Sequence, residues 1–186
     1  MDAGYLRNQF LIAMPSLSDE NFGHTVTLLC EHNEQGALGL VINRPTELHL
    51  NEMLSHLSLD PGAISQANPP VYWGGPVQPE RGFVVHREAG DWESTMHIGD
   101  HLWVTTSRDI LGALTEGRGP DHYIVLLGYA GWGAGQLETE LLSNAWLNTP
   151  VDKAILFDTP VAARWSAATR LLGVDVTQLT GDAGHA

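Results

Sequence analysis

The sequence has little cysteine, no long apolar run and no leader pattern. A single cysteine, Cys30, excludes an internal disulfide and a four-cysteine metal site. No apolar run approaches the roughly 18 residues that a membrane-spanning helix needs. The first residues lack the basic and apolar regions of a signal peptide. These absences predict a soluble, cytoplasmic protein without a membrane anchor.

Positive charge is also scarce. The chain has 9 Lys and Arg residues against 22 Asp and Glu residues, which gives a net charge of −13. The basic residues are scattered singly along the sequence, whereas nucleic-acid binding uses clustered cations that release counterions. We therefore expect no direct DNA or RNA binding, and no attachment to anionic membranes.

What is present indicates one globular domain over residues 1–186, with a core at about 6–173 and a frayed tail at 180–186. A hydrophobic content of 43% with 17% charged residues is typical of a folded protein. The first half shows short strand patterns, with a hairpin loop at Asn33–Gly36, and the second half alternates strands and helices. This order predicts an α+β domain built on a large mixed, mainly antiparallel β-sheet with flanking helices.

Periodicity predicts the individual elements. The expected helices are Leu50–Leu57, a segment after Ser107 that ends at Gly117, Gln136–Leu147 and a segment between Thr159 and Gly173. The expected strands are Phe10–Met14, His24–His32, Ala37–Ile42, Val71–Trp73, Phe83–His86, Trp92–Ile98, Leu102–Thr106, Tyr123–Leu127 and Ala154–Phe157. Residues 58–70 are expected to form a loop.

The densest motif is Gly128-Tyr-Ala-Gly-Trp-Gly-Ala-Gly-Gln-Leu-Glu138, which we expect to be a loop between a strand and a helix. One interpretation is a tight turn in which Trp132 packs. The other is a site for a neutral or metal-linked small ligand, at the end of a strand paired in parallel with Ala154–Phe157. A phosphate loop is disfavoured, because Lys and Ser/Thr are absent after the last glycine and two glutamates follow. The candidate ligand residues here are Gly131, Trp132, Gly133, Gly135 and Gln136.

Cysteine and histidine supply further candidates. Cys30 and His32 lie two apart on an expected strand, so their side chains are predicted to share a face, with Glu31 opposite. They form either a thiolate–imidazole pair or an inert core cysteine beside a histidine. His97 and His101 flank an expected β-turn at Gly99. Whether Glu31, His32 and His86 gather in space stays open, and we expect no metal or cofactor.

Several motifs in order resemble the AlgH-like (YqgE) family of uncharacterised bacterial proteins, from about residue 6 to residue 173. They are Phe10-Leu-Ile-Ala-Met-Pro15, Cys30-Glu-His32, Gly36-Ala-Leu-Gly-Leu-Val-Ile-Asn-Arg-Pro45, Gly74-Gly-Pro-Val77, Arg81-Gly-Phe-Val-Val-His86, the glycine motif extended to Glu140, and Asn144-Ala-Trp-Leu147. The resemblance implies a single α+β domain with a large mixed sheet. It also implies a role as a transcriptional regulator, because the family takes its name from a proposed regulator of alginate production. It supplies no catalytic residues.

Together these observations favour a non-enzymatic regulatory or partner-binding protein. Because the chain is acidic, its effect on transcription is expected to be indirect, through an unidentified protein or small molecule. No G-x-S-x-G elbow is present. The alternative is an enzyme or small-ligand-binding protein with a pocket near Gly131–Gly135, next to His32 or His86. Arg44 and Arg81 each stand beside Pro or Gly. We expect each to anchor a carboxylate, which belongs either to the chain itself or to a ligand. The oligomeric state stays open.

Overall fold

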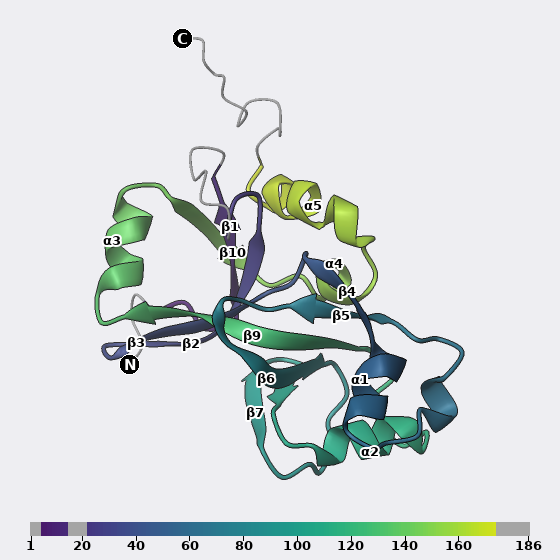
Figure 1. The fold of residues 1–186 in the computed structure, drawn as a ribbon. Helices are drawn as coiled ribbons and strands as arrows, with labels where there is room; N and C mark the ends of the chain where they lie inside the picture. The colour runs from purple at the N-terminus through teal and green to yellow at the C-terminus, as the bar shows by residue number, and fades with distance from the viewer. Residues whose placement is uncertain (1–4, 15–21, 174–186) are drawn as a thin grey trace.

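The computed structural model describes residues 5–14 and 22–173 and has a mixed α+β architecture (Figure 1). Within these residues, ten strands form one sheet, with the order β10-β1-β2-β3-β9-β6-β8-β7 and with β4 and β5 branching from it. All neighbouring strands are antiparallel except β5 and β9. The strands are β1 (Gln9–Ala13), β2 (Val26–Asn33), β3 (Gly36–Val41), β4 (Pro45–His49), β5 (Pro70–Trp73), β6 (Val77–His86), β7 (Thr95–Gly99), β8 (Leu102–Thr105), β9 (Tyr123–Gly133) and β10 (Trp146–Pro150).

The sheet is organised around β9, which has partners on both edges. Tyr72 and Trp73 of β5 pair with the same β9 residues as Gly82 and Phe83 of β6, so β5 and β6 lie on opposite edges. Further along β9, the edge that pairs with β5 pairs with β3 instead. The chain between β5 and β6 must therefore cross over β9.

Glycines stand on both strands of chain at the point where the β5–β6 connection crosses β9. A Cβ on Gly75 would lie 2.1 Å from the carbonyl carbon of Tyr129, and one on Gly128 would lie 2.3 Å from the oxygen of Gly75. Gly128 also has φ 79°, a left-handed conformation that disfavours side chains. Two backbones in direct contact explain why glycine stands at Gly75 and Gly128.

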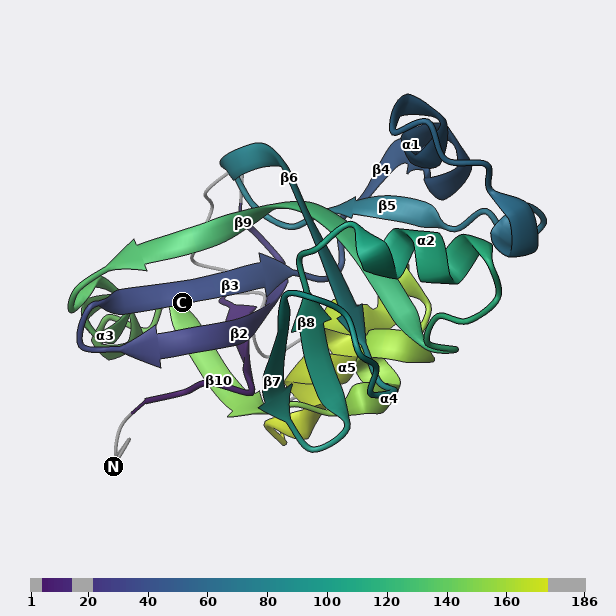
Figure 2. The same ribbon diagram turned by 90° about the horizontal axis from the view of Figure 1, so that it is seen from below.

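Within the described residues, three apolar clusters pack against the sheet. The helices that close them lie at separate places around the sheet (Figures 1 and 2). Helices α4 and α5 close the largest, which contains Phe10, Leu28 and Leu126. Helices α1 and α2 close the second, and α3 closes the third, around Trp132 and Trp146. The helices are α1 (Leu50–His56), α2 (Asp109–Thr115), α3 (Gln136–Leu142), α4 (Lys153–Phe157) and α5 (Arg164–Leu171), with 3-10 turns at Gly62–Ile64 and Val161–Ala163.

Several expected elements are confirmed, and three are corrected. The β2–β3 hairpin, α1 and the positive-φ glycines that follow α2 and α5 agree with the sequence patterns. The glycine motif is extended strand up to Gly133, and only residues 134–135 turn. The helix expected to reach Leu147 ends at Leu142, because Trp146 begins β10 against β1. Residues 154–157 are helical rather than a strand, so no parallel partner for β9 lies there.

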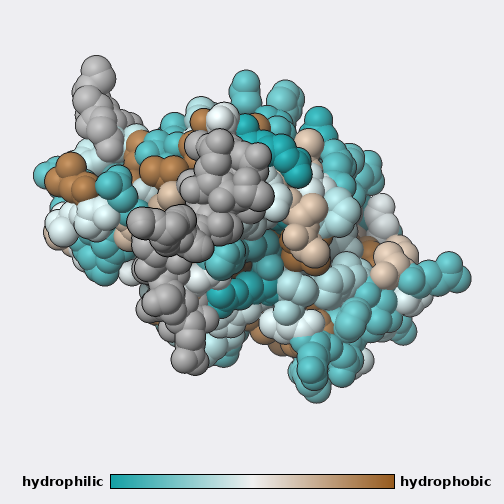
Figure 3. All heavy atoms as spheres, turned by 90° about the horizontal axis from the view of Figure 1, so that it is seen from above, coloured by the Kyte–Doolittle hydropathy of each residue, from teal (hydrophilic) through white to brown (hydrophobic). Residues whose placement is uncertain are grey.

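The described residues contain no helix that is long and apolar enough to cross a membrane. The face seen in Figure 3 is mostly hydrophilic, with apolar residues in small separate patches. The tail expected to fray, 180–186, lies outside the described residues.

Candidate functional site

The far end of β9 forms an open platform together with β2 and β3 (Figure 2). Gly131 pairs with Leu38, which pairs with Glu31, and Gly133 pairs with Gly36, which pairs with Asn33. Side chains two residues apart on a strand share a face, so these two rows lie on the same surface. A groove of about 480 Å³ lies over this surface. Its lining comes from Glu31, Asn33, Gln35, Gly36, Ala37, Leu38, Val77, Tyr129, Gly131 and Trp132.

Gly131 and Gly133 have no steric need to be glycine within the described residues. A Cβ on Gly131 would meet Tyr129 at 3.6 Å and Val77 at 4.0 Å, which are ordinary contacts. One on Gly133 would lie 3.9 Å from the side-chain oxygen of Gln136. Neither residue has a positive φ, and both are exposed. Glycine inside a strand weakens it, and it often marks a place where another backbone or a ligand approaches closely. The groove leaves room for such an approach at Gly131.

The opposite face of the same segment holds α3 in place. The Trp132 side chain is buried, and its indole N–H donates to Glu140 Oε1 at 3.0 Å. Trp146 donates to the same oxygen at 2.9 Å. Gln136 accepts from the Gly133 N–H at 2.9 Å and donates to Glu140 Oε2 at 2.9 Å. Trp132 and Gln136, two of the sequence candidates, thus form hydrogen bonds within the protein, and Glu140 accepts from both indoles.

Gly135, another sequence candidate, precedes α3 with φ 76°. This left-handed conformation accounts for glycine there, in contrast to Gly131 and Gly133. The groove reaches Gly131 and stops short of this turn, so the structure separates Gly135 from the open platform.

His32 lies on the α3 face of β2, and its side chain is buried. The Leu6 N–H donates to His32 Nδ1 at 3.0 Å, and Nε2 lies 3.1 Å from Glu138 Oε2. A neutral ring with its proton on Nε2 satisfies both partners. Tyr5 packs edge-on at 5.0 Å between ring centroids. His32 therefore ties the start of the chain and α3 to β2.

Cys30 and His32 do not share a face, so that prediction is wrong. A bulge between Leu29 and Glu31 adds a residue to β2 and reverses the alternation. Cys30 packs in the largest core cluster with no exposed surface. Burial raises the pKa of the Cys30 thiol, which disfavours a thiolate. The cysteine is a small core residue.

His86 lies on β6 opposite Tyr123, at the other end of β9 from the platform. Its Nδ1 lies 2.8 Å from the Glu88 carbonyl oxygen and therefore carries the proton. Its Nε2 accepts from the Thr105 hydroxyl at 2.8 Å. Burial lowers the pKa of His86, which favours this neutral form. The pair has the geometry of a base and a nucleophile, but Thr105 has no exposed surface in this structure.

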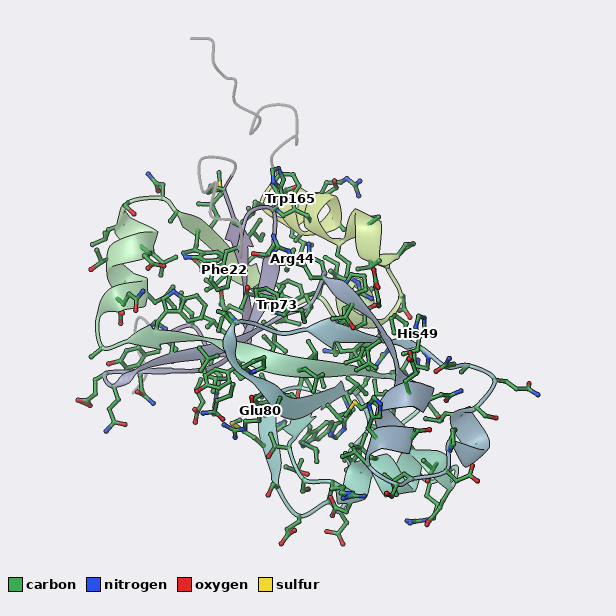
Figure 4. All side chains as sticks on the ribbon, viewed as in Figure 1. Phe22, Arg44, His49, Trp73, Glu80 and Trp165 are labelled. Carbon is green, nitrogen blue, oxygen red and sulfur yellow. The ribbon has the colours of Figure 1, made fainter. Side chains whose placement is uncertain are left out.

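Arg44, the remaining sequence candidate, lies in an aromatic cluster away from the groove (Figure 4). One of its guanidinium nitrogens donates to the Gly23 carbonyl at 2.8 Å, and the group lies 5.5 Å from the Trp73 ring centroid. Phe22 packs 6.2 Å from Trp73. Arg44 is therefore anchored by a carbonyl and an aromatic ring.

Arg81 and Tyr129 are site residues that the sequence patterns did not reveal as partners. The Arg81 guanidinium lies 5.9 Å from the ring centroid of Tyr129, which lines the groove, and 5.1 Å from that of Phe83. Arg81 thus places a positive charge beside the groove, while Glu31 lines it with a negative one. Only the strand register brings these residues together.

The sequence left a metal cluster of Glu31, His32 and His86 open. Over residues 5–14 and 22–173, no group of three or more His, Cys, Asp or Glu side chains is arranged to hold a metal ion. His97 belongs to β7, and His101 to the turn before β8, as the sequence predicts.

Comparison with known proteins places the chain in a family. A family model described as AlgH-like matches residues 10–177. A UPF0301 protein of Nitrosococcus oceani is 53% identical over 182 residues, covering 98% of this chain and 97% of that protein. A UPF0301 protein of Thioalkalivibrio sulfidiphilus is 57% identical over 179 residues, covering 96% of each.

Solved structures agree. The solution structure of the AlgH protein from Pseudomonas aeruginosa is similar with a TM-score of 0.81 and 52% identity, covering 100% of this chain and 98% of that one. A crystal structure of a Corynebacterium diphtheriae protein has a TM-score of 0.71 at 20% identity, covering 88% and 85%, and shows the fold alone. Because the family model and relatives of about half identity span nearly the whole chain, the protein belongs to the AlgH-like family.

Proposed function

We propose that the chain is a non-enzymatic, cytoplasmic partner-binding protein that regulates through a bound protein rather than through DNA. Its partner contributes an extended segment that lies across Gly131 and Gly133. The supporting observation is that Gly131, which lines the groove, and Gly133, two residues further along the platform, are both exposed and have no steric need to be glycine within the described residues.

The chemistry of the groove supports an extended peptide. Leu38, Val77 and Tyr129 supply apolar contacts, and the bare backbone at Gly131 lets another main chain come close. Glu31 and Arg81 offer one charge of each sign, which sets the direction of a bound segment. A net charge of −13 opposes nucleic acid as the partner.

The binding test uses Gly131→Val. A valine fits the extended backbone of a strand and occupies the groove floor. Affinity capture from the native host, with quantitative mass spectrometry, should return proteins with the wild-type chain that Gly131→Val loses. A purified partner should then bind wild type and bind Gly131→Val at least about tenfold more weakly, a loss of about 1.4 kcal/mol.

Gly112→Ala is the matched control, because a Cβ on Gly112 meets nothing within 4 Å and Gly112 lies on α2, away from the groove. It should retain every partner. Equal capture by Gly131→Val and wild type would contradict the groove as the binding face. Retardation of duplex DNA at physiological salt would contradict the indirect mode of action.

A further inference from the structure

A second cavity lies between the sheet and the helix pair α1 and α2, apart from the groove. Its volume is about 190 Å³. Residues Glu80, Gly82, Phe83 and Val84 of β6 line it. The other walls come from α1 and the residue after it, from β9, and from the segment 105–111 that runs from the end of β8 into α2. Among the residues that the structure describes, none lines both this cavity and the groove.

The walls of the cavity are mostly apolar, although Thr105, Thr106 and Ser107 also line it. The apolar residues are Met53, Leu57, Phe83, Val84, Leu111, Val125 and Leu127. Of these, Val84, Leu111 and Val125 are at most 6% exposed. A dry cavity of about 150 Å³ is enough to bind benzene. This cavity therefore accommodates an apolar group the size of a ring or a branched four-carbon chain.

The mouth of the cavity carries one charge of each sign. Glu80 and Arg108 both line it, and both are exposed. Among the described residues neither has an ion pair, and Arg108 donates only to the Leu57 carbonyl oxygen. The neighbouring Asp109 carboxylate is occupied, because it accepts from the Ser107 hydroxyl at 2.6 Å and the Glu93 N–H at 2.8 Å.

Gly82 keeps the cavity open. A Cβ there would lie 3.9 Å from both Leu127 Cδ2 and Met53 Cε, at ordinary contact distance. Gly82 has no positive φ, so the backbone accepts a side chain. The glycine therefore contributes empty space rather than a conformation.

We propose that this cavity binds an α-amino acid with an apolar side chain of about leucine size. The side chain fills the apolar interior, Arg108 binds the carboxylate, and Glu80 binds the ammonium group. A zwitterion forms a charge-assisted contact with each of the two side chains, whereas a ligand with one charge forms only one, so the mixed pair favours a zwitterion. The volume is below the 300–1,000 Å³ typical of sites for drug-sized ligands, which restricts the site to small molecules.

The test is isothermal titration of the full chain with L-leucine, 4-methylpentanoate and 3-methylbutylamine. The three share the branched apolar group, and only leucine carries both charges. We expect leucine to bind at least about tenfold more tightly than either analogue, the effect of one charge-assisted contact. Equal binding of 4-methylpentanoate and leucine, or no binding of leucine at millimolar concentration, would overturn the proposal.

Variants locate the site. Gly82→Val should abolish leucine binding by filling the cavity, and Glu80→Gln should weaken leucine without weakening 4-methylpentanoate. Arg108→Gln should weaken leucine and 4-methylpentanoate together, while Arg108→Lys, which keeps the charge, should recover part of the binding. Circular dichroism checks that each variant is folded. Gly131→Val, which alters the groove only, should bind leucine as wild type does, and unchanged binding by Gly82→Val would place the ligand elsewhere.

Discussion

Gly128 and Gly131 lie three residues apart on β9 and have opposite surroundings. At Gly128 another stretch of backbone presses on the strand, and the φ angle is left-handed. At Gly131 the backbone is ordinary strand, and the nearest atoms leave room for a side chain. The comparison teaches that a glycine-rich motif combines two requirements, one internal to the fold and one directed outward.

The largest expected loss of stability comes from replacing Gly128, the glycine that the fold itself requires. Gly128→Ala puts a methyl group against the Gly75 carbonyl oxygen in a left-handed conformation. We expect a loss of about 2–5 kcal/mol of unfolding free energy. Urea denaturation followed by circular dichroism measures it. A loss as small as that of Gly131→Ala would show that the crossing at Gly75 relaxes freely.

The second largest effect is expected on the buried face behind the open platform, where α3 packs against β9. Glu140→Ala removes the oxygen shared by the indoles of Trp132 and Trp146, both largely buried. We expect a loss of roughly 2–4 kcal/mol, since bonds to a charged acceptor are stronger than neutral ones. Thermal unfolding followed by tryptophan fluorescence reports it. Glu140→Gln keeps one oxygen and should lose less; equal losses would mean that the carboxylate charge is immaterial.

An intermediate case is Gly39 on β3. A Cβ there would lie 2.6 Å from Thr27 Cγ2, a side-chain atom, and 3.2 Å from the Leu28 carbonyl oxygen. We expect Gly39→Ala to cost about 1–3 kcal/mol by overpacking. Thr27→Ser removes the obstructing methyl group and should recover part of that loss in a double-mutant cycle. Additive losses would assign the strain to the backbone instead.

The smallest expected effect on stability is at Gly131, on the open platform. Gly131→Ala should leave the unfolding free energy unchanged or raise it by up to about 1 kcal/mol, because alanine loses less entropy on folding than glycine. Chemical denaturation at equilibrium measures it. A loss greater than about 2 kcal/mol would show that the fold itself needs glycine at this position. The proposal that Gly131 is glycine because a partner binds there would then lose its supporting observation.

Sequence patterns predicted the fold class and most strands because alternation and turn residues are local signals. They were wrong at residues 154–157, where a short apolar run fits a strand or a helix equally well. Asp152 settles that case as an N-cap, since its side chain accepts from the Ala154 N–H. Trp146 was included in a helix because its spacing suited α3, while pairing with Ala13 places it in β10.

The candidate site was only partly predictable. The motif and family resemblance drew attention to Gly131, but the neighbours Leu38, Tyr129 and Arg81 come from other strands, and their proximity depends on register. The β2 bulge shows the same limit, because one extra residue places Cys30 on the opposite face from His32, and the break in alternation at Leu29 fits a strand buried on both faces as well as it fits a bulge. Contacts set by long-range pairing are absent from local patterns.

The place of β9 between β3 and β6 also has a consequence for the order in which the chain folds. The β2–β3 and β7–β8 hairpins join residues close in sequence, but they are linked through β9 and β6, and β1 gains its second neighbour from β10. A chain emerging from the ribosome cannot complete the sheet until residue 150 is available. The region of β1, β2 and β3 and the region of β6, β8 and β7 can therefore join only after β9 is made, through contacts between residues far apart in sequence.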